Sequence, residues 1–162
     1  MKLYVKEKLI SMHNRYYIYN EGGEIEYEIE SKIISLGDKT TIYDKNHNII
    51  AYIEQEILHL MPHYNIYIEN EYKYQIKKKF QLFKNDYELS NLYKVDGSIF
   101  SYNFTIYNNY GKEIALINRK FLSIGDKYQI EILDEKDINT ILTIIVAITN
   151  DIDRNQSNSS SN

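Results

Sequence analysis

The chain has 162 residues, a net charge of −4 and no cysteine, so its length is that of a single domain. The lack of cysteine excludes disulfides, thiol nucleophiles and cysteine-based metal centres. The acidic charge argues against nucleic-acid binding, which requires a basic surface. Seventeen tyrosines, many isoleucines and a single proline favour β-strands along most of the sequence.

Twelve short strands are predicted, separated by turn sequences rich in Gly, Asn and Asp. The clearest pattern is at residues 24–34, where Ile and Tyr alternate with Glu and predict one buried and one solvated face. The expected strands are residues 2–10, 15–19, 24–34, 39–43, 49–59, 64–68, 73–83, 86–90, 93–99, 103–107, 113–121 and 127–132. An open sheet of this size would leave exposed edges, so a closed antiparallel β-barrel of twelve strands is expected.

The C-terminal segment is the candidate filling for this barrel. Residues 134–137 are mostly acidic, as suits a helix N-terminus, and residues 138–149 are apolar on nearly every side of a helical wheel. We predict a buried helix here, although the β-branched residues also permit a strand. The apolar part is shorter than the ~20 residues of a membrane span, so no transmembrane span is expected. Residues 153–162, rich in Asn and Ser, are predicted to be a disordered tail after a single domain of residues 1–152.

An internal repeat supports a regular architecture. Residues 32–39 (KIISLGDK) recur as residues 120–127 (KFLSIGDK), inside a degenerate unit of about 24 residues. Gly-Asp-Lys is typical of a turn, and we therefore assign Asp38 and Asp126 to turn stability rather than to acid–base catalysis.

Five short segments of the sequence are distinctive: residues 1–6 (MKLYVK), 35–39 (SLGDK), 41–44 (TIYD), 76–80 (IKKKF) and 123–128 (SIGDKY). On these segments the sequence resembles the LURP-one-related family, and the likeness covers roughly residues 1–152. The resemblance implies the fold shared with tubby C-terminal domains and phospholipid scramblases, a twelve-stranded barrel around a hydrophobic C-terminal helix. It implies no settled activity: tubby relatives bind phosphoinositide headgroups and scramblase relatives act on membranes. The turns at residues 11–15 and 59–63 depart from the Gly-Asp-Lys form.

A lysine-rich segment is the candidate site for anions or lipid headgroups. It contains Lys73, Lys77, Lys78, Lys79 and Lys84, with no acidic residue among them. Ammonium groups in such a cluster would attract phosphates or an anionic membrane surface. The alternative interpretation is a solvated strand face. Strand alternation places Lys73, Lys77 and Lys79 on one face and Lys78 and Lys84 on the other, unless a bulge intervenes.

No catalytic, cofactor-binding or metal-binding residue is predicted. His59 and His63 are four residues apart, which aligns metal ligands on a helix, but Pro62 predicts a turn, so we interpret both histidines as turn residues. The sequence contains no glycine-rich phosphate-binding motif. It also lacks a sequence-local grouping of Ser, His and Asp typical of nucleophilic catalysis.

These features favour a non-enzymatic binding or scaffold domain. The absence of cysteine and of an apolar N-terminal run suits a cytoplasmic protein, docked peripherally on anionic membranes by its lysine-rich strand. The expected partners are anionic lipid headgroups or an unidentified protein, and no cofactor or nucleic acid. The alternatives are a protein-interaction module using exposed strand faces, and a small-molecule carrier or enzyme with a cavity beside the helix.

Overall fold

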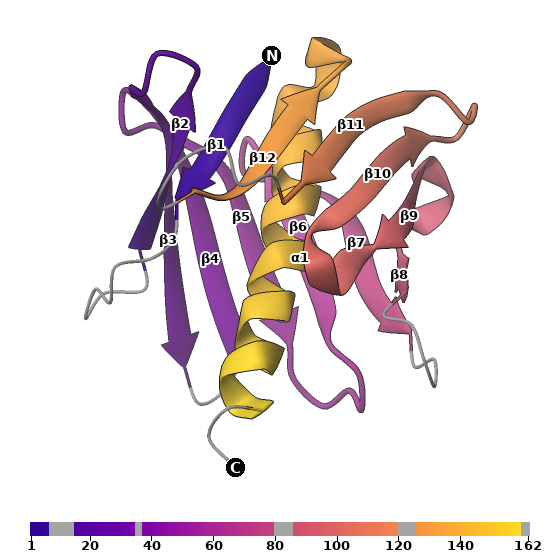
Figure 1. The fold of residues 1–162 in the computed structure, drawn as a ribbon. Helices are drawn as coiled ribbons and strands as arrows, with labels where there is room; N and C mark the ends of the chain where they lie inside the picture. The colour runs from indigo at the N-terminus through magenta and orange to yellow at the C-terminus, as the bar shows by residue number, and fades with distance from the viewer. Residues whose placement is uncertain (7–14, 35–36, 80–85, 120–125, 160–162) are drawn as a thin grey trace.

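The computed structural model describes residues 1–6, 15–34, 37–79, 86–119 and 126–159. They form one antiparallel sheet of twelve strands wrapped around one long helix (Figure 1). The strands are β1 (Lys2–Lys6), β2 (Arg15–Asn20), β3 (Ile25–Ile34), β4 (Gly37–Asp44), β5 (Ile49–Glu56), β6 (His63–Ile68), β7 (Glu71–Lys79), β8 (Asp86–Glu88), β9 (Tyr93–Ser98), β10 (Asn103–Asn108), β11 (Glu113–Asn118) and β12 (Asp126–Ile132). All twelve expected strands are confirmed, and the predicted extensions at residues 7–10, 80–83 and 120–121 lie outside the described residues.

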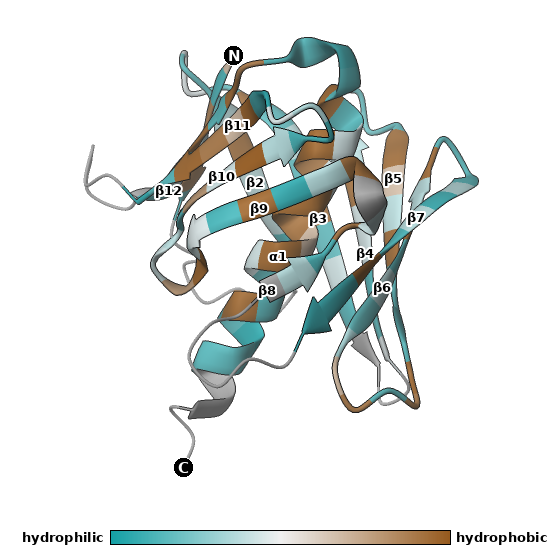
Figure 2. Cartoon of the chain, turned by 90° about the vertical axis from the view of Figure 1, so that its right-hand side faces the viewer, coloured by the Kyte–Doolittle hydropathy of each residue, from teal (hydrophilic) through white to brown (hydrophobic). Residues whose placement is uncertain are grey.

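The sheet is a nearly closed barrel. Its strand order is β8-β7-β6-β5-β4-β3-β2-β1-β12-β11-β10-β9. Strands that are neighbours in the sequence pair with each other, except β8 and β9, which are the two edges of the sheet, and β1 pairs with β12. Short helix η1 (Ser90–Leu92) connects β8 to β9, and an isolated bridge between Leu89 and Tyr93 spans the seam there (Figure 2). Two further short helices are η2 (Ile99–Ser101) and η3 (Glu135–Asp137).

Alternating side chains give each strand of the barrel wall one buried face and one solvent-facing side. In β3, Tyr27 and Ile29 are buried, while Glu26, Glu28 and Glu30 lie on the solvent side. The same alternation recurs in β6, where Tyr64, Ile66 and Ile68 are buried. Because one face of each strand is apolar, closing the sheet brings these faces into one core.

Helix α1 (Ile138–Ser159) fills the barrel, as the sequence predicts (Figure 1). Its side chains at residues 141–149 and at Ile152 are buried against the strands. The two buried threonines satisfy their hydroxyl groups within the helix: Thr143 donates to the carbonyl of Asn139 at 2.5 Å, and Thr149 donates to that of Ile145 at 2.8 Å. Polar residues are therefore tolerated in the core because their hydrogen bonds are made locally.

Two details differ from the expectations. Residues 153–159 belong to α1, where a disordered tail was expected from residue 153, and residues 160–162 lie outside the described residues. Gly37, Asp38 and Lys39 begin strand β4 rather than forming the turn. Asp38 pairs with the guanidinium of Arg154 on α1 rather than capping its own backbone.

In the described part of the chain, no helix is long and apolar enough to cross a membrane.

Candidate functional site

The lysines of β7 divide between the two faces of the barrel, as strand alternation predicts. Lys73, Lys77 and Lys79 are exposed, and Lys78 is buried. Lys84 lies outside the described residues. The five lysines therefore do not form one cluster, and Lys78 has to be removed from the expected outer anion site.

Lys78 instead belongs to a buried polar cluster around Asp151 of α1. Its Nζ lies 2.6 Å from Asp151 Oδ2, and the hydroxyl groups of Tyr64 and Tyr87 each donate to the same carboxylate at 2.7 Å. Burial, followed by the charge of Asp151, raises the pKa of both tyrosines well above the ordinary value. Both phenols thus remain protonated donors, and the cluster holds the helix rather than exposing a charge to a ligand.

Other polar residues near the end of α1 also contact the wall. Asn150 donates to Ser31 Oγ at 3.2 Å and accepts from the Tyr16 hydroxyl at 3.1 Å. Asp153 accepts from Lys127 Nζ at 2.5 Å, and Arg154 donates to Gln55 Oε1 at 2.9 Å. This polar layer is not among the sequence predictions. The available signal is the change from apolar to polar residues after position 149, whereas the predicted disordered tail begins at residue 153.

On the outer face of β7, two of the three lysines have carboxylate partners. Lys73 lies 2.7 Å from Glu71, and Lys79 lies 3.4 Å from Glu88. Lys77 lies opposite His63 on β6 and Glu88 on β8, but Glu88 makes its ion pair with Lys79, and Lys77 has no ion pair with a carboxylate among the described residues. Lys77 therefore remains the most available cation of the predicted segment.

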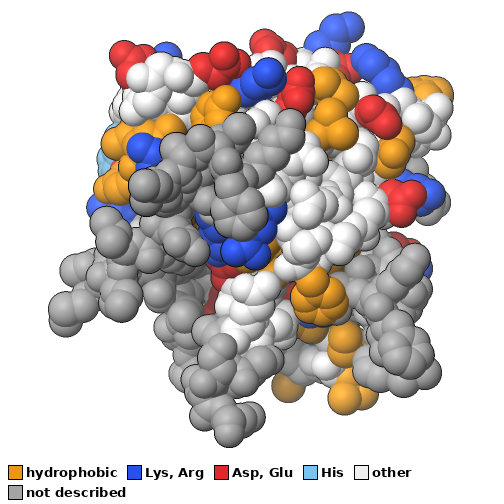
Figure 3. All heavy atoms as spheres, in the orientation of Figure 1, with side chains coloured by type: hydrophobic (Ala, Val, Ile, Leu, Met, Phe, Trp, Pro, Cys, Tyr) orange, Lys and Arg blue, Asp and Glu red, His pale blue; other side chains and the backbone are white. Residues whose placement is uncertain are grey.

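The loop between β5 and β6 (residues 57–62) lies beside this end of β7 and exposes apolar side chains. The side chains of Leu58 and Leu60 are 97% and 104% exposed, and Ile57 is 47% exposed. Figure 3 shows hydrophobic side chains at the lower end of the molecule, where Figure 1 places this loop. The sequence analysis placed residues 57–59 in a strand, but β5 ends at Glu56 and Leu58 has a positive φ of 81°. The chain therefore leaves the sheet and turns there.

The same loop brings three possible ligand groups together. Ligand atoms of Glu56, His59 and His63 all lie within 4.8 Å of one another. The two imidazole rings are stacked, with 3.9 Å between their centroids. The sequence argument that only a helix would bring these histidines together is therefore wrong, because the turn does so.

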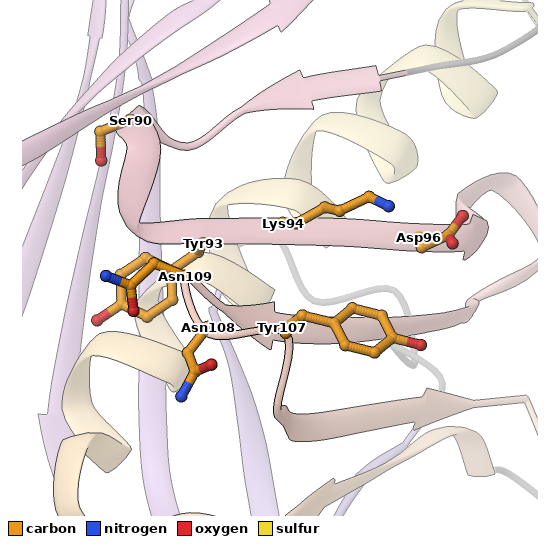
Figure 4. Close-up of a pocket in the computed structure, with 8 residues that line it drawn as sticks. Ser90, Tyr93, Lys94, Asp96, Tyr107, Asn108 and Asn109 are labelled. Atoms are coloured by element: carbon orange, nitrogen blue, oxygen red, sulfur yellow. The ribbon is translucent and has the colours of Figure 1, made fainter.

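A surface pocket of about 600 Å³ lies over β9 and the end of β10 (Figure 4). It is lined by Ser90, Tyr93, Lys94, Asp96, Tyr107, Asn108, Asn109 and Gly111. A smaller pocket of about 180 Å³ shares Tyr93 and Asn108 with it and reaches Ile141 of α1. The groups in Figure 4 can hydrogen-bond a polar ligand, and burial raises the pKa of Tyr93.

Comparisons with known proteins agree with this architecture. The chain is similar to an Arabidopsis thaliana protein of known X-ray structure, with a TM-score of 0.67 and 14% sequence identity over 92% of this chain and 89% of that one. At this identity the likeness supports the fold alone. No curated protein is similar enough in sequence to be matched. The LURP-one-related family model matches residues 1–149, which contain all twelve strands and most of the buried part of α1. The chain therefore belongs to the LURP-one-related family.

Proposed function

We propose that the protein is a non-enzymatic binding domain that docks on anionic membrane surfaces through the β5–β6 loop and the adjoining end of β7. The observation that carries this proposal is the exposure of Leu58 and Leu60, which is almost complete. They lie in the loop that leads into His63, the cross-strand partner of Lys77. Lys79 lies on the same outer face two residues further along the strand. We call Leu58, Leu60, Lys77 and Lys79 the docking tip.

The shape of the tip favours a bilayer over a groove in another protein. A loop that protrudes with two leucines can enter the boundary between headgroups and acyl chains, while ammonium groups remain among the headgroups. Burying a leucine side chain contributes roughly 1.5–3 kcal/mol, and a lysine near an anionic surface contributes about 1 kcal/mol. The four residues together supply about 5–8 kcal/mol before the cost of association. We therefore expect weak, reversible docking.

Co-sedimentation with vesicles tests this function. The full chain should bind vesicles of phosphatidylserine and phosphatidylcholine at low salt, and should bind much less at high salt or to phosphatidylcholine alone. Leu58→Ser/Leu60→Ser and Lys77→Glu/Lys79→Glu should each abolish most of this binding. Lys2→Glu/Lys45→Glu makes the same charge change at exposed positions away from the tip, and should retain clearly more binding than Lys77→Glu/Lys79→Glu.

Two outcomes would contradict membrane docking. One is no binding to anionic vesicles at low salt. The other is equal loss of binding in the two charge-reversal variants, which would indicate a general charge effect instead of a local site. A protein partner captured by the same loop, without vesicle binding, would favour the protein-interaction alternative.

The pocket in Figure 4 favours a second candidate, the binding of a small polar molecule. Its volume of about 600 Å³ is within the range of ligand pockets. Screening metabolites by thermal shift, with Asp96→Ala and Tyr107→Phe as pocket variants, tests this candidate. A ligand whose stabilising effect persists in both variants would not be bound there.

A further inference from the structure

The group formed by Glu56, His59 and His63 has the geometry of a metal-binding site. Glu56 ends β5, His63 begins β6, and His59 lies in the loop between them. His59 Nε2 lies 2.9 Å from Glu56 Oε2, and His63 Nδ1 lies 3.9 Å from the same oxygen. Ligand atoms around a tetrahedral zinc ion are about 3.3–3.6 Å apart, because each bond is about 2.0–2.2 Å long. The two observed distances lie on either side of this value.

Neighbouring side chains hold the carboxylate in the required orientation. Asn65 Nδ2 donates to Glu56 Oε1 at 2.9 Å, so the opposite oxygen, Oε2, faces the histidines. Gln75 Nε2 in turn donates to Asn65 Oδ1 at 3.0 Å. Such outer hydrogen bonds typically orient the ligands of metal sites.

One positive charge lies close to the three ligand groups. Lys77 pairs with His63 across β6 and β7. Its ammonium group should therefore weaken the binding of a cation.

We propose that Glu56, His59 and His63 bind one divalent transition-metal ion, and that zinc is the ion this ligand set fits best. Two imidazoles and a carboxylate are a known zinc ligand set, in which water or another ligand takes the fourth position. The side chains are 34%, 41% and 20% exposed, so an ion can reach them from solvent. This site shares the β5–β6 loop and Lys77 with the docking tip, but the proposal does not depend on membrane docking. It replaces the expectation, made from the sequence, that the histidines serve only as turn residues.

Calorimetric titration of the full chain with Zn²⁺, without lipid, tests the proposal. Wild type should bind one ion per chain, and the same site should give a visible absorption spectrum of four-coordinate Co²⁺. His59→Ala and His63→Ala should each weaken binding at least tenfold. Asn65→Ala should weaken it by about ten- to one hundredfold through loss of the outer hydrogen bond. Lys77→Met should strengthen it.

His47 provides a matched control. It also lies in a turn near a carboxylate, with its Nδ1 3.5 Å from Glu28 Oε2, but it does not belong to the Glu56 group. His47→Ala should bind Zn²⁺ as wild type does. Zn²⁺ should raise the melting temperature of wild type and of His47→Ala, but not that of His59→Ala. Absence of saturable binding, or equal binding by wild type and His59→Ala, would overturn the proposal.

Discussion

Lys78 and Asp151 form an ion pair inside the barrel, with 2.6 Å between Nζ and Oδ2 and at most 7% of either side chain exposed. The pair joins β7 to α1, and Tyr64 and Tyr87 complete its hydrogen bonds. Removing one partner of such a pair leaves the other charged and buried without compensation, whereas removing both does not.

We therefore expect Asp151→Leu and Lys78→Met each to lower the free energy of unfolding by about 3–5 kcal/mol. The double variant Lys78→Met/Asp151→Leu should lose much less than the sum of the single changes. Lys79→Met is the neighbouring control, because its partner Glu88 is exposed and such surface pairs contribute about 0–1 kcal/mol. Urea unfolding measures all four variants, and additive losses in the double variant would contradict the buried-pair interpretation.

Ile144 tests whether the helix is central to the fold. Its side chain is completely buried, so Ile144→Asp would place an unpaired charge inside the barrel and should prevent folding. Ile144→Val removes one methylene and should cost about 0.5–1.5 kcal/mol. Circular dichroism during heating provides the measurement. If Ile144→Asp melts like wild type, the helix does not hold the barrel together.

Gly37 is the glycine of the repeated Gly-Asp-Lys sequence, and two constraints act on it. Its φ is +117°, and an added Cβ would lie 2.7 Å from the carbonyl oxygen of Gln55 on β5. Gly23 also has a positive φ, of +78°, but an added Cβ there would have no neighbour within 4 Å. Both alanine variants should lose stability through backbone strain. Chemical unfolding should show a clearly larger loss of stability for Gly37→Ala than for Gly23→Ala. Equal losses would show that the close approach to Gln55 has no energetic cost.

Stability should fall at alkaline pH because buried tyrosines resist ionisation. The pKa of Tyr27 is raised to about 12, chiefly by burial and then by the charge of Glu26. A tyrosine in the unfolded chain ionises near pH 10. The folded protein therefore keeps a proton that the unfolded chain releases, so this contribution is complete below about pH 10 and is lost as the pH rises toward 12.

Unfolding followed by circular dichroism between pH 9 and about pH 12 should show this decline, with tyrosinate absorbance rising as structure is lost. Tyr27→Phe should reduce the slope of stability against pH, and Tyr110→Phe, at a position 89% exposed, should not. If all tyrosines ionise near pH 10 while the fold remains intact, the raised pKa values are wrong.

Local pattern was enough to predict the architecture. The strands and the face of each β7 lysine follow from the two-residue period, which each segment carries in its own sequence. The position of α1 follows from an apolar stretch too short for a membrane and too apolar for the surface. The strands, the facing of the β7 lysines and the buried helix each depend on residues close together in the sequence. They can therefore be predicted from a single sequence.

The partners of the inward-facing polar residues could not be predicted in this way. Lys78 was placed on the opposite face from Lys77, but its carboxylate is 73 positions away in the sequence. Residues 153–156 are predicted to be disordered because their composition is polar. In the structure, the barrel wall contacts Asp153 and Arg154 through Lys127, Asp38 and Gln55. His59 and His63 come together across a loop in which Leu58 has a positive φ, a conformation that leucine rarely adopts and that no sequence pattern indicates.

The two Gly-Asp-Lys segments together determine the rotation and depth of α1 inside the barrel. Asp38 on β4 pairs with Arg154, and Lys127 on β12 pairs with Asp153, the residue before it on α1. Strands β3, β2 and β1 separate these two contacts around the wall. Consecutive helix residues project about 100° apart, so sliding or rotating α1 by one position would break both pairs and bring like charges toward each other. The duplicated segment thus selects a single rotation and depth for the helix, a specificity that its apolar surface alone would not provide.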